Sequence, residues 1–403
     1  MQFKSQYFDL IILGAGITGL SVARQQLLTD SGCKVLIIEK EEKIGLHASG
    51  RNSGVLHSGI YYQSDSLKAK FCSEGGQLIA EYCQEFGLPI KRCGKVIVPK
   101  TAEEDNYLDL LHKRAELNGA ETRIIDKAEL NEIEPAAFSA TSRALYSPNT
   151  SVVDPHSVIN KILLNLMNNN VVVAFEEYVT SADPQLSLIR TNKNVVYEYG
   201  HLINCTGQYS DLVSKIFNIG KQYYLIPFKG MYYKLKDESQ IRLNGLVYPV
   251  PDLRIPFLGI HSVKLVNGDI YFGPNSIPAL GREHYEGIKG INVKDTIKTS
   301  YYLLKQYLDN KDGFRSFAHR ELQQISEYSF YTEATKMIPK LKSTDLIKSK
   351  KVGIRAQLYN KEKHAFEMDF IIKNQDNITH ILNAVSPAFT SAFSFAKYIL
   401  NRK

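Results

Sequence analysis

The sequence has few cysteines and no long apolar run. Its five cysteines are scattered and form no CxxC pair, so the sequence suggests neither a disulfide framework nor a metal site, zinc included. No apolar stretch approaches the ~18 to 20 residues needed to cross a bilayer. Only a few residues precede the first strand-like run, which leaves no room for a signal or transit peptide. We therefore expect a cytoplasmic protein whose cysteine thiols are reduced. Any membrane contact is expected to be peripheral, on the inner face of the cell membrane.

The sequence also lacks a concentrated basic tract and internal repeats. Its formal charge of +7 is spread over many separate lysines, which argues against nucleic acid as a partner and is compatible with an anionic substrate or a membrane surface. With 403 residues, 44% of them apolar, the chain can bury a core large enough for two or three domains.

The stretch YFDLIILGAGITGLSVARQ, residues 7–25, places three spaced glycines between a strand-like run and a helix-like run. Gly14, Gly16 and Gly19 form GxGxxG. Glu39 ends the next apolar run, KVLIIE. In this setting the glycines allow a tight turn, the approach of a pyrophosphate and the packing of helix on strand, while the acidic residue accepts hydrogen bonds from a ribose. The pattern predicts dinucleotide binding and fits NAD and FAD equally.

The loop that follows, GLHASGRNSGVLHSGIYY, residues 45–62, is rich in glycine, serine and asparagine around Arg51, His47 and His57. Such a loop offers backbone amides and one guanidinium to a cofactor that extends beyond its adenine end. A dehydrogenase that binds only NAD would have no evident use for it. The loop therefore favours FAD.

Strand and helix patterns alternate through much of the chain. We expect parallel strands over 8–13 and 34–39 with a helix over 16–28 between them. A further helix is expected to begin at Pro155, capped by Asp154.

Two later segments read differently. Residues 225–275 contain short strands bounded by proline and glycine, and Asn267-Gly268 predicts a two-residue hairpin within an antiparallel sheet. In the closing segment, Ser386 and Pro387 are expected as the cap and first position of the last helix.

These patterns together predict an α/β fold. We expect a Rossmann-like FAD-binding domain, a doubly wound parallel sheet, with an inserted α+β substrate domain built on an antiparallel sheet. The FAD-binding domain is expected over residues 1–90, 145–220 and 350–403. The substrate-binding domain is expected over residues 91–144 and 221–349.

Further runs spread over nearly the whole chain carry a specific resemblance. They are SGRNSGVLHSGIYYQSDSLKAKFC, CGKVIV, NTSVVDPHSV, IPFKGMYYKL, VYPVPDLRIPFLGIHSVKLVNGDIYFGPNSIPALGRE and NAVSPAFTSAF. In them the sequence resembles the L-2-hydroxyglutarate dehydrogenase (oxidase) family of the FAD-dependent, D-amino-acid-oxidase-like superfamily. The resemblance implies noncovalent FAD and oxidation of L-2-hydroxyglutarate to 2-oxoglutarate. It departs at Lys229, where arginine is usual in PFRG, and at SPAFTSAF, which is bulkier than the family's SPAATS.

The expected FAD contacts come from the glycine turn, the small-residue loop and the last helix. The amides at the start of that helix could face the pyrimidine oxygens of the flavin. The full set is Gly14, Gly16, Ile17, Thr18, Gly19, Glu39, Lys40, Ser49, Arg51, Asn52, Ser53, Gly54, Thr206, Gly207, Arg355, Ser386, Ala388 and Thr390.

A small dicarboxylic 2-hydroxy acid presents a hydroxyl proton, a hydride and two carboxylates. An imidazole with an ordinary pKa of about 6.5 suits the base, and His57 and His261 are the candidates. Each carboxylate needs a cation or several donors. The residues expected there are Arg254, Lys229, Tyr248 and Arg282.

Other readings stay open at this point. The protein could oxidise an amino acid or amine with FAD, or bind flavin as a non-catalytic scaffold. The cluster of Lys229, Arg254, His261 and Arg282 in the expected inserted sheet favours the diacid. The cofactor carries the redox chemistry. From it, electrons could pass to a quinone of the electron-transport chain or to oxygen.

Overall fold

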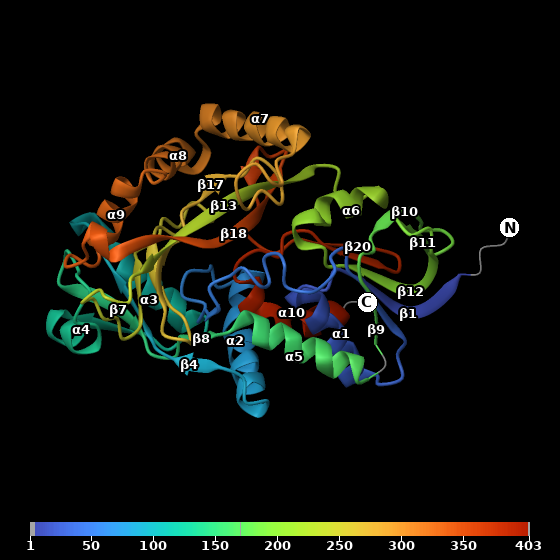
Figure 1. The fold of residues 1–403 in the computed structure, drawn as a ribbon, viewed down its shortest axis with the longest axis horizontal. Coiled ribbons are helices and arrows are strands. Elements are labelled where there is room, and N and C mark those ends of the chain that lie inside the picture. The colour runs from blue at the N-terminus through green and yellow to red at the C-terminus, as the bar shows by residue number, and fades with distance from the viewer. Residues whose placement is uncertain (1–4, 170, 402–403) are drawn as a thin grey trace. The chain divides into compact units, whose positions relative to one another are not determined.

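The computed structural model describes residues 5–169 and 171–401, and the chain divides into two compact units (Figure 1). Unit 1 comprises residues 1–52, 155–227 and 355–403, and unit 2 comprises residues 53–154 and 228–354. The units are defined by contacts, whereas the expected domains are defined by their ligands. The expected domain borders therefore stay a prediction.

Unit 1 is built on a mixed sheet with a parallel centre. Its parallel strands run in the order β9 (Val172–Ala174), β2 (Val35–Ile38), β1 (Gln6–Leu13), β12 (Val196–Asn204) and β21 (Ile378–Ile381). Antiparallel additions are β10 (Val179–Asp183), β11 (Leu188–Thr191) and β20 (Ile372–Gln375). Leu13 of β1 is in register with Asn204 of β12, so the carboxyl ends of these strands lie side by side.

The helices of unit 1 are α1 (Ile17–Thr29), α5 (Pro155–Met167), α6 (Ser210–Ile216) and α10 (Ala388–Leu400). Helix α1 packs against both α5 and α10, and the Arg24 guanidinium lies 4.5 Å from the centre of the Phe393 ring. Strands β1 and β2 and helix α1 confirm the predicted βαβ start. The expectation for α10 is wrong in detail: Pro387 is the cap residue and Ala388 the first helical position, because Pro387 has φ −99° and ψ 43°, outside the helical region.

Unit 2 contains several smaller sheets. One has the order β14 (Leu246–Pro249), β5 (Lys95–Val98), β7 (Arg143–Ser147) and β6 (Arg123–Asp126). Another is β3 (Val55–Leu56), β8 (Ser151–Val153) and β4 (Ile90–Arg92). Strand β14 runs parallel to β5, so the expectation that residues 225–275 form one antiparallel sheet is wrong at β14.

The remaining sheet has the order β15 (His261–Lys264), β16 (Ile270–Gly273), β13 (Tyr223–Leu235), β18 (Leu346–Asn360) and β19 (Ala365–Phe366), with β17 (Ile277–Pro278) on β13. The unit borders fall within β13 and β18. Strands β15 and β16 are antiparallel, and Gly268 in their turn has φ +94°. The predicted hairpin is therefore confirmed, but its two-residue loop is wrong. Lys264 pairs with Ile270, the Leu265 amide donates to the Asp269 carbonyl at 2.8 Å and the Gly268 amide to the Leu265 carbonyl at 3.0 Å, so three residues, 266–268, form the loop with Gly268 in the left-handed position.

Six α-helices lie in the described part of unit 2: α2 (Leu67–Glu85), α3 (Asn106–Leu117), α4 (Lys127–Ile133), α7 (Val293–Asp309), α8 (Phe314–Gln323) and α9 (Glu327–Thr335). Its buried clusters centre on residues such as Val96, Phe272 and Phe330 in one group and Ile97, Leu145 and Tyr248 in another. None of the helices in residues 5–169 and 171–401 has the length and apolar character needed to span a membrane.

Candidate functional site

The glycine turn of unit 1 is closed by main-chain contacts. Gly14 has φ +99°, and a Cβ there would lie 2.7 Å from the Cys205 carbonyl oxygen at the end of β12. A Cβ at Gly19 would lie 2.0 Å from the Gly14 carbonyl oxygen. A Cβ at Gly16 would meet only the Ser49 hydroxyl, at 2.9 Å. Gly14 and Gly19 are therefore required by the fold itself, whereas Gly16 leaves open backbone for a ligand.

The start of α1 offers main-chain amides to an anion. Gly16 caps the helix in an extended conformation and supplies no side-chain acceptor. The Ile17 amide donates to the Ser49 hydroxyl at 2.9 Å, and the first turn, which includes Thr18, carries no acidic residue. An open helix start without negative charge fits the pyrophosphate of a dinucleotide.

Glu39 lies at the end of β2 against this turn. Its carboxylate accepts from the Ala15 amide at 2.8 Å and from the Glu41 amide at 3.0 Å, one bond to each oxygen. Each carboxylate oxygen has a second lone pair, so the group can still accept from ribose hydroxyls. Lys40, the next residue, pairs with Glu41 and lies 5.1 Å from the centre of the Tyr209 ring.

The loop after Gly45 is held by its own polar groups. The Arg51 Nε donates to the Leu46 carbonyl at 2.6 Å, and the Asn52 amide donates to the Ser49 carbonyl at 2.8 Å. A Cβ at Gly50 would lie 2.1 Å from the Gly45 carbonyl oxygen. The small residues thus permit a tightly folded loop, which fits the expectation that backbone amides are presented to a flavin.

The other expected FAD contacts occupy three places. Thr206 and Gly207 follow β12, and the Thr206 hydroxyl donates to the Asn204 side chain at 2.6 Å. Ser53 and Gly54 belong to unit 2, where the Gly54 carbonyl accepts from the Val153 amide at 2.9 Å. In unit 1, Arg355 lies on β18, Ser386 before α10, and Ala388 and Thr390 in its first turn. Their contact with flavin stays a prediction.

In unit 2 the structure brings together two of the expected catalytic residues. His261 begins β15 and Tyr248 lies on β14, and their ring centres are 4.0 Å apart. The His261 Nδ1 is 2.7 Å from the Gly259 carbonyl oxygen. A carbonyl can only accept, so Nδ1 carries the proton and the neutral ring has its lone pair on Nε2. This hydrogen bond fixes the ring's orientation and tautomer, and its role as a base stays a prediction.

A buried lysine lies near the Tyr248 ring. Lys95 on β5 is 1% exposed, and its Nζ lies 4.8 Å from the Tyr61 ring centre and 5.4 Å from the Tyr248 ring centre. Among the described residues its Nζ has no hydrogen-bond partner. Burial lowers the pKa of the Lys95 ammonium to about 8. A buried cation without an anion is costly to the fold, and such groups gather at functional sites.

The expected carboxylate-binding cations differ in their surroundings. Arg254 is largely exposed and donates to both carboxylate oxygens of Asp252, at 2.9 and 2.8 Å. Burial would raise the pKa of Asp252, but the hydrogen bonds and charge of Arg254 outweigh it and hold that pKa below its ordinary value. The buried Arg282 has its Nε 3.6 Å from Asp295. Burial lowers the pKa of Lys229, and the like charge of Lys348 adds to the effect.

His57, the other expected base, lies in the loop after β3 and is half-buried. Its carbonyl accepts from the Cys72 thiol at 3.2 Å. Burial raises the pKa of this thiol to about 12, so Cys72 stays a neutral thiol. This bond holds the backbone of His57 and leaves the role of its ring a prediction.

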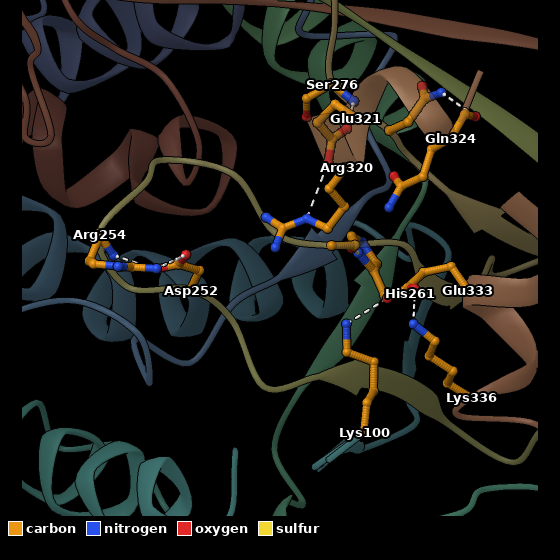
Figure 2. A network of polar contacts seen from close by, with 12 residues as sticks. Lys100, Asp252, Arg254, His261, Ser276, Arg320, Glu321, Gln324, Glu333 and Lys336 are labelled. Atoms are coloured by element: carbon orange, nitrogen blue, oxygen red, sulfur yellow. Dashed lines mark hydrogen bonds and ion pairs between the residues drawn. The ribbon is translucent and has the colours of Figure 1, made fainter. Parts of the chain in front are cut away.

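Figure 2 shows a wider polar network in the same unit. Glu321 is buried. Its carboxylate accepts from the Ser276 amide at 2.6 Å and faces the Arg320 Nε at 4.0 Å. The charge of Arg320 also lowers the pKa of Asp252. In the same view Lys100 donates to Glu333 at 2.6 Å. Arg320 is thus a second cation close enough to Asp252 to lower its pKa.

Sequence reasoning missed Lys95 and Arg320. Lys95 stands in the strand-like run CGKVIV, in which a lysine that points inward looks the same as one that points to solvent. Arg320 stands in the charged helix α8, where a surface role is the ordinary expectation. The only signal for Lys95 was the apolar run beside it.

Comparison with known proteins gives a consistent picture. The model of the family described as FAD dependent oxidoreductase matches residues 9–402. The chain is 34% identical to L-2-hydroxyglutarate dehydrogenase of Indibacter alkaliphilus, over 96% of each protein. It is 33% identical to the mitochondrial L-2-hydroxyglutarate dehydrogenase of Bos taurus, over 97% of this chain and 88% of the relative.

A solved structure supports the same fold. L-alpha-glycerophosphate oxidase from Mycoplasma pneumoniae, with FAD bound, superposes with a TM-score of 0.77 at 20% identity, over 98% of this chain and 94% of that one. The predicted Rossmann-like FAD fold with a substrate domain is therefore confirmed. The chain belongs to the FAD dependent oxidoreductase family, within it to the L-2-hydroxyglutarate dehydrogenases, and FAD is its cofactor.

Proposed function

We propose that this protein oxidises L-2-hydroxyglutarate to 2-oxoglutarate. The observation that carries the proposal is the His261 imidazole, fixed by the Gly259 carbonyl, with its ring centre 4.0 Å from that of Tyr248, which in turn lies 5.4 Å from the buried Lys95 Nζ. Relatives that match nearly the whole chain are named L-2-hydroxyglutarate dehydrogenases, which supports this substrate. FAD supplies the hydride acceptor.

The chain's own residues then account for the proton and for substrate binding. The His261 Nε2 takes the hydroxyl proton as the C2–H bond gives up its hydride, and the C–O bond becomes a carbonyl. Fixing Nδ1 on the Gly259 carbonyl keeps the ring in one tautomer. His57 is the alternative base.

The two carboxylates need cations. We propose that Lys229 and Arg254 bind the two carboxylates and that the Tyr248 hydroxyl donates to the substrate. Arg282 already faces the carboxylate of Asp295 on α7, so we propose that it holds α7 in place and does not bind the substrate directly. The lowered pKa of Lys229 would return toward its ordinary value when an anion binds, since an opposite charge favours the ammonium. Substrate binding should therefore take up protons at alkaline pH.

Electrons must then leave the enzyme. We propose a quinone of the electron-transport chain as the acceptor, which would bring the protein to the inner face of the cell membrane as a peripheral protein. Oxygen is the alternative acceptor.

Anaerobic flavin bleaching tests the proposed substrate. The purified holoenzyme should lose its flavin absorbance with L-2-hydroxyglutarate and keep it with the D isomer. Bleaching by amino acids alone would contradict the proposal and favour an amino-acid oxidase. Re-oxidation of the bleached enzyme by a soluble quinone, compared with re-oxidation by air, then identifies the better acceptor.

A further inference from the structure

Helix α7 presents its apolar side to solvent. Five large residues recur at intervals of three and four positions, the spacing of one helix face. They are Val293, Ile297, Tyr301, Leu304 and Leu308, and each is between 58% and 69% exposed. We call this row the α7 stripe.

The inward side of the same helix is polar. Thr299 and Gln306 are buried, at 3% and 1% exposure, and Gln306 donates to the Lys311 carbonyl at 3.4 Å. Asp295 in the first turn faces Arg282. An ordinary surface helix buries its apolar side, so α7 is inverted, and burial within unit 2 does not explain the α7 stripe.

Lysines border the α7 stripe. Lys294, Lys298 and Lys305 follow one another around the helix next to the apolar residues, and within the described chain none of the three has a carboxylate partner at ion-pair distance. Of the acidic residues of α7, Asp295 is turned toward Arg282, and Asp309 lies beyond the lysines when counted from the stripe. The outer side of α7 is thus apolar with a cationic border.

Neighbouring segments also carry exposed apolar residues. Ile288 and Ile291, just before α7, are 87% and 40% exposed. In Figure 1, α7 and α8 are consecutive orange helices of unit 2, and they are in contact. Leu322 of α8 is 58% exposed as well.

We propose that the α7 stripe docks this protein on an anionic lipid bilayer. An apolar helix face beside lysines fits the boundary between acyl chains and negative headgroups. In a two-fold contact between copies of this chain the patch would pair with itself, which would set the unpaired lysines against one another. Lipid phosphates neutralise them instead. The inference deepens the proposed function, because it names the surface by which a membrane quinone would be approached.

Co-sedimentation of the full-length holoenzyme with vesicles tests this surface. Binding is expected to vesicles of phosphatidylcholine mixed with phosphatidylglycerol, to be weaker with phosphatidylcholine alone, and to fall as salt is raised toward about 1 M, where the Debye length is ~3 Å. The double variant Leu304→Glu, Leu308→Glu should lose at least tenfold in binding. The triple variant Lys294→Ser, Lys298→Ser, Lys305→Ser should lose binding only to the anionic vesicles.

A matched control is available on helices of unit 1. Leu28 and Leu164 are 65% and 53% exposed, and the variant Leu28→Glu, Leu164→Glu should bind vesicles like the parent protein. All variants should keep their flavin spectrum and their anaerobic reduction in solution. Failure of the proposed substrate would show in that reduction assay and leave vesicle binding unchanged.

Two results would overturn the membrane proposal. The first is a parent protein that does not bind the anionic vesicles, or an α7 double variant that binds them equally well. The second is a double variant whose sedimentation velocity changes from dimer to monomer while vesicle binding stays the same. In that case a second copy of the chain covers the α7 stripe.

Discussion

Unit 1 and unit 2 prepare for their ligands with different parts of the chain. In unit 1 the decisive atoms belong to the backbone: the Gly14 carbonyl that excludes a Cβ at Gly19, and the Ile17 amide at the start of α1. In unit 2 they belong to side chains: the His261 and Tyr248 rings, whose centres are 4.0 Å apart, and the Lys95 Nζ, 5.4 Å from the Tyr248 ring centre. A Cβ that meets main-chain atoms, as at Gly14 and Gly19, should destabilise unit 1. Side-chain changes in unit 2 should act through charge and orientation.

The largest effect is expected in the glycine turn. Gly19→Ala places a Cβ 2.0 Å from a carbonyl oxygen of the backbone, which cannot move without opening the turn. We expect a loss of at least ~3 kcal/mol in the free energy of unfolding, at the upper end for overpacked cores, together with loss of bound flavin. Urea unfolding and the flavin-to-protein absorbance ratio measure both.

The neighbouring glycine supplies the control. A Cβ at Gly16 meets only the movable Ser49 hydroxyl, so Gly16→Ala should keep most of the stability and weaken flavin binding alone. If Gly19→Ala unfolded at the same urea concentration as the parent, the backbone account of unit 1 would be wrong.

The next effect concerns the base in unit 2. His261→Ala should slow flavin reduction by two or more decades, within the roughly 10²- to 10⁴-fold range of general base catalysis, while the bound flavin spectrum stays the same. Stopped-flow reduction by L-2-hydroxyglutarate measures it. His112, which bonds to Thr122 at 2.8 Å, gives a control in His112→Ala.

The same measurement on His57→Ala decides between the two candidates. A larger loss with His57→Ala than with His261→Ala would transfer the role of base to His57. Near-normal reduction in both variants would remove histidine as the base.

Lys95 should connect stability and activity to pH. Its folded pKa of about 8 lies below its ordinary value of 10.5, so the cost of burying the charge is fully present below pH 8 and is relieved as pH rises to 10.5. The difference corresponds to ~3 kcal/mol at most. Lys95→Met should therefore be more stable than the parent below pH 8, and the gap should close toward pH 10.5.

Activity separates a role in positioning from a purely structural one. A cation behind Tyr248 disfavours the imidazolium of His261, so Lys95→Met should raise the apparent pKa of the acidic limb of kcat/KM. Lys113→Met, at an exposed lysine, should change neither stability nor that limb. An unchanged acidic limb in Lys95→Met would leave Lys95 without a role in the reaction.

The same division explains what the sequence could predict. The glycine turn, α1 and Glu39 lie within a single βαβ unit, so their spacing was enough to place them. The Tyr248, His261 and Lys95 group comes from β14, β15 and β5, and only the fold brings β14 beside β5. The pair of Arg254 with Asp252 is a different case. The two residues are only two positions apart, so the pair could have been predicted from the run PDLR.

The smallest effect is expected at Gly268, a backbone position in the hairpin that carries the His261 side chain. Gly268 has φ +94°, and a Cβ added there would have no other atom within 4 Å, so Gly268→Ala meets no steric contact and should cost only about 1 to 2 kcal/mol for the left-handed backbone. Its turn connects β15, which begins at His261, to β16. Because the His261 end of β15 is the end away from this turn, urea unfolding should shift while the rate of flavin reduction changes less than about twofold. A reduction rate that fell with stability would show that the orientation of His261 depends on the hairpin turn and not on the Gly259 carbonyl and the Tyr248 ring.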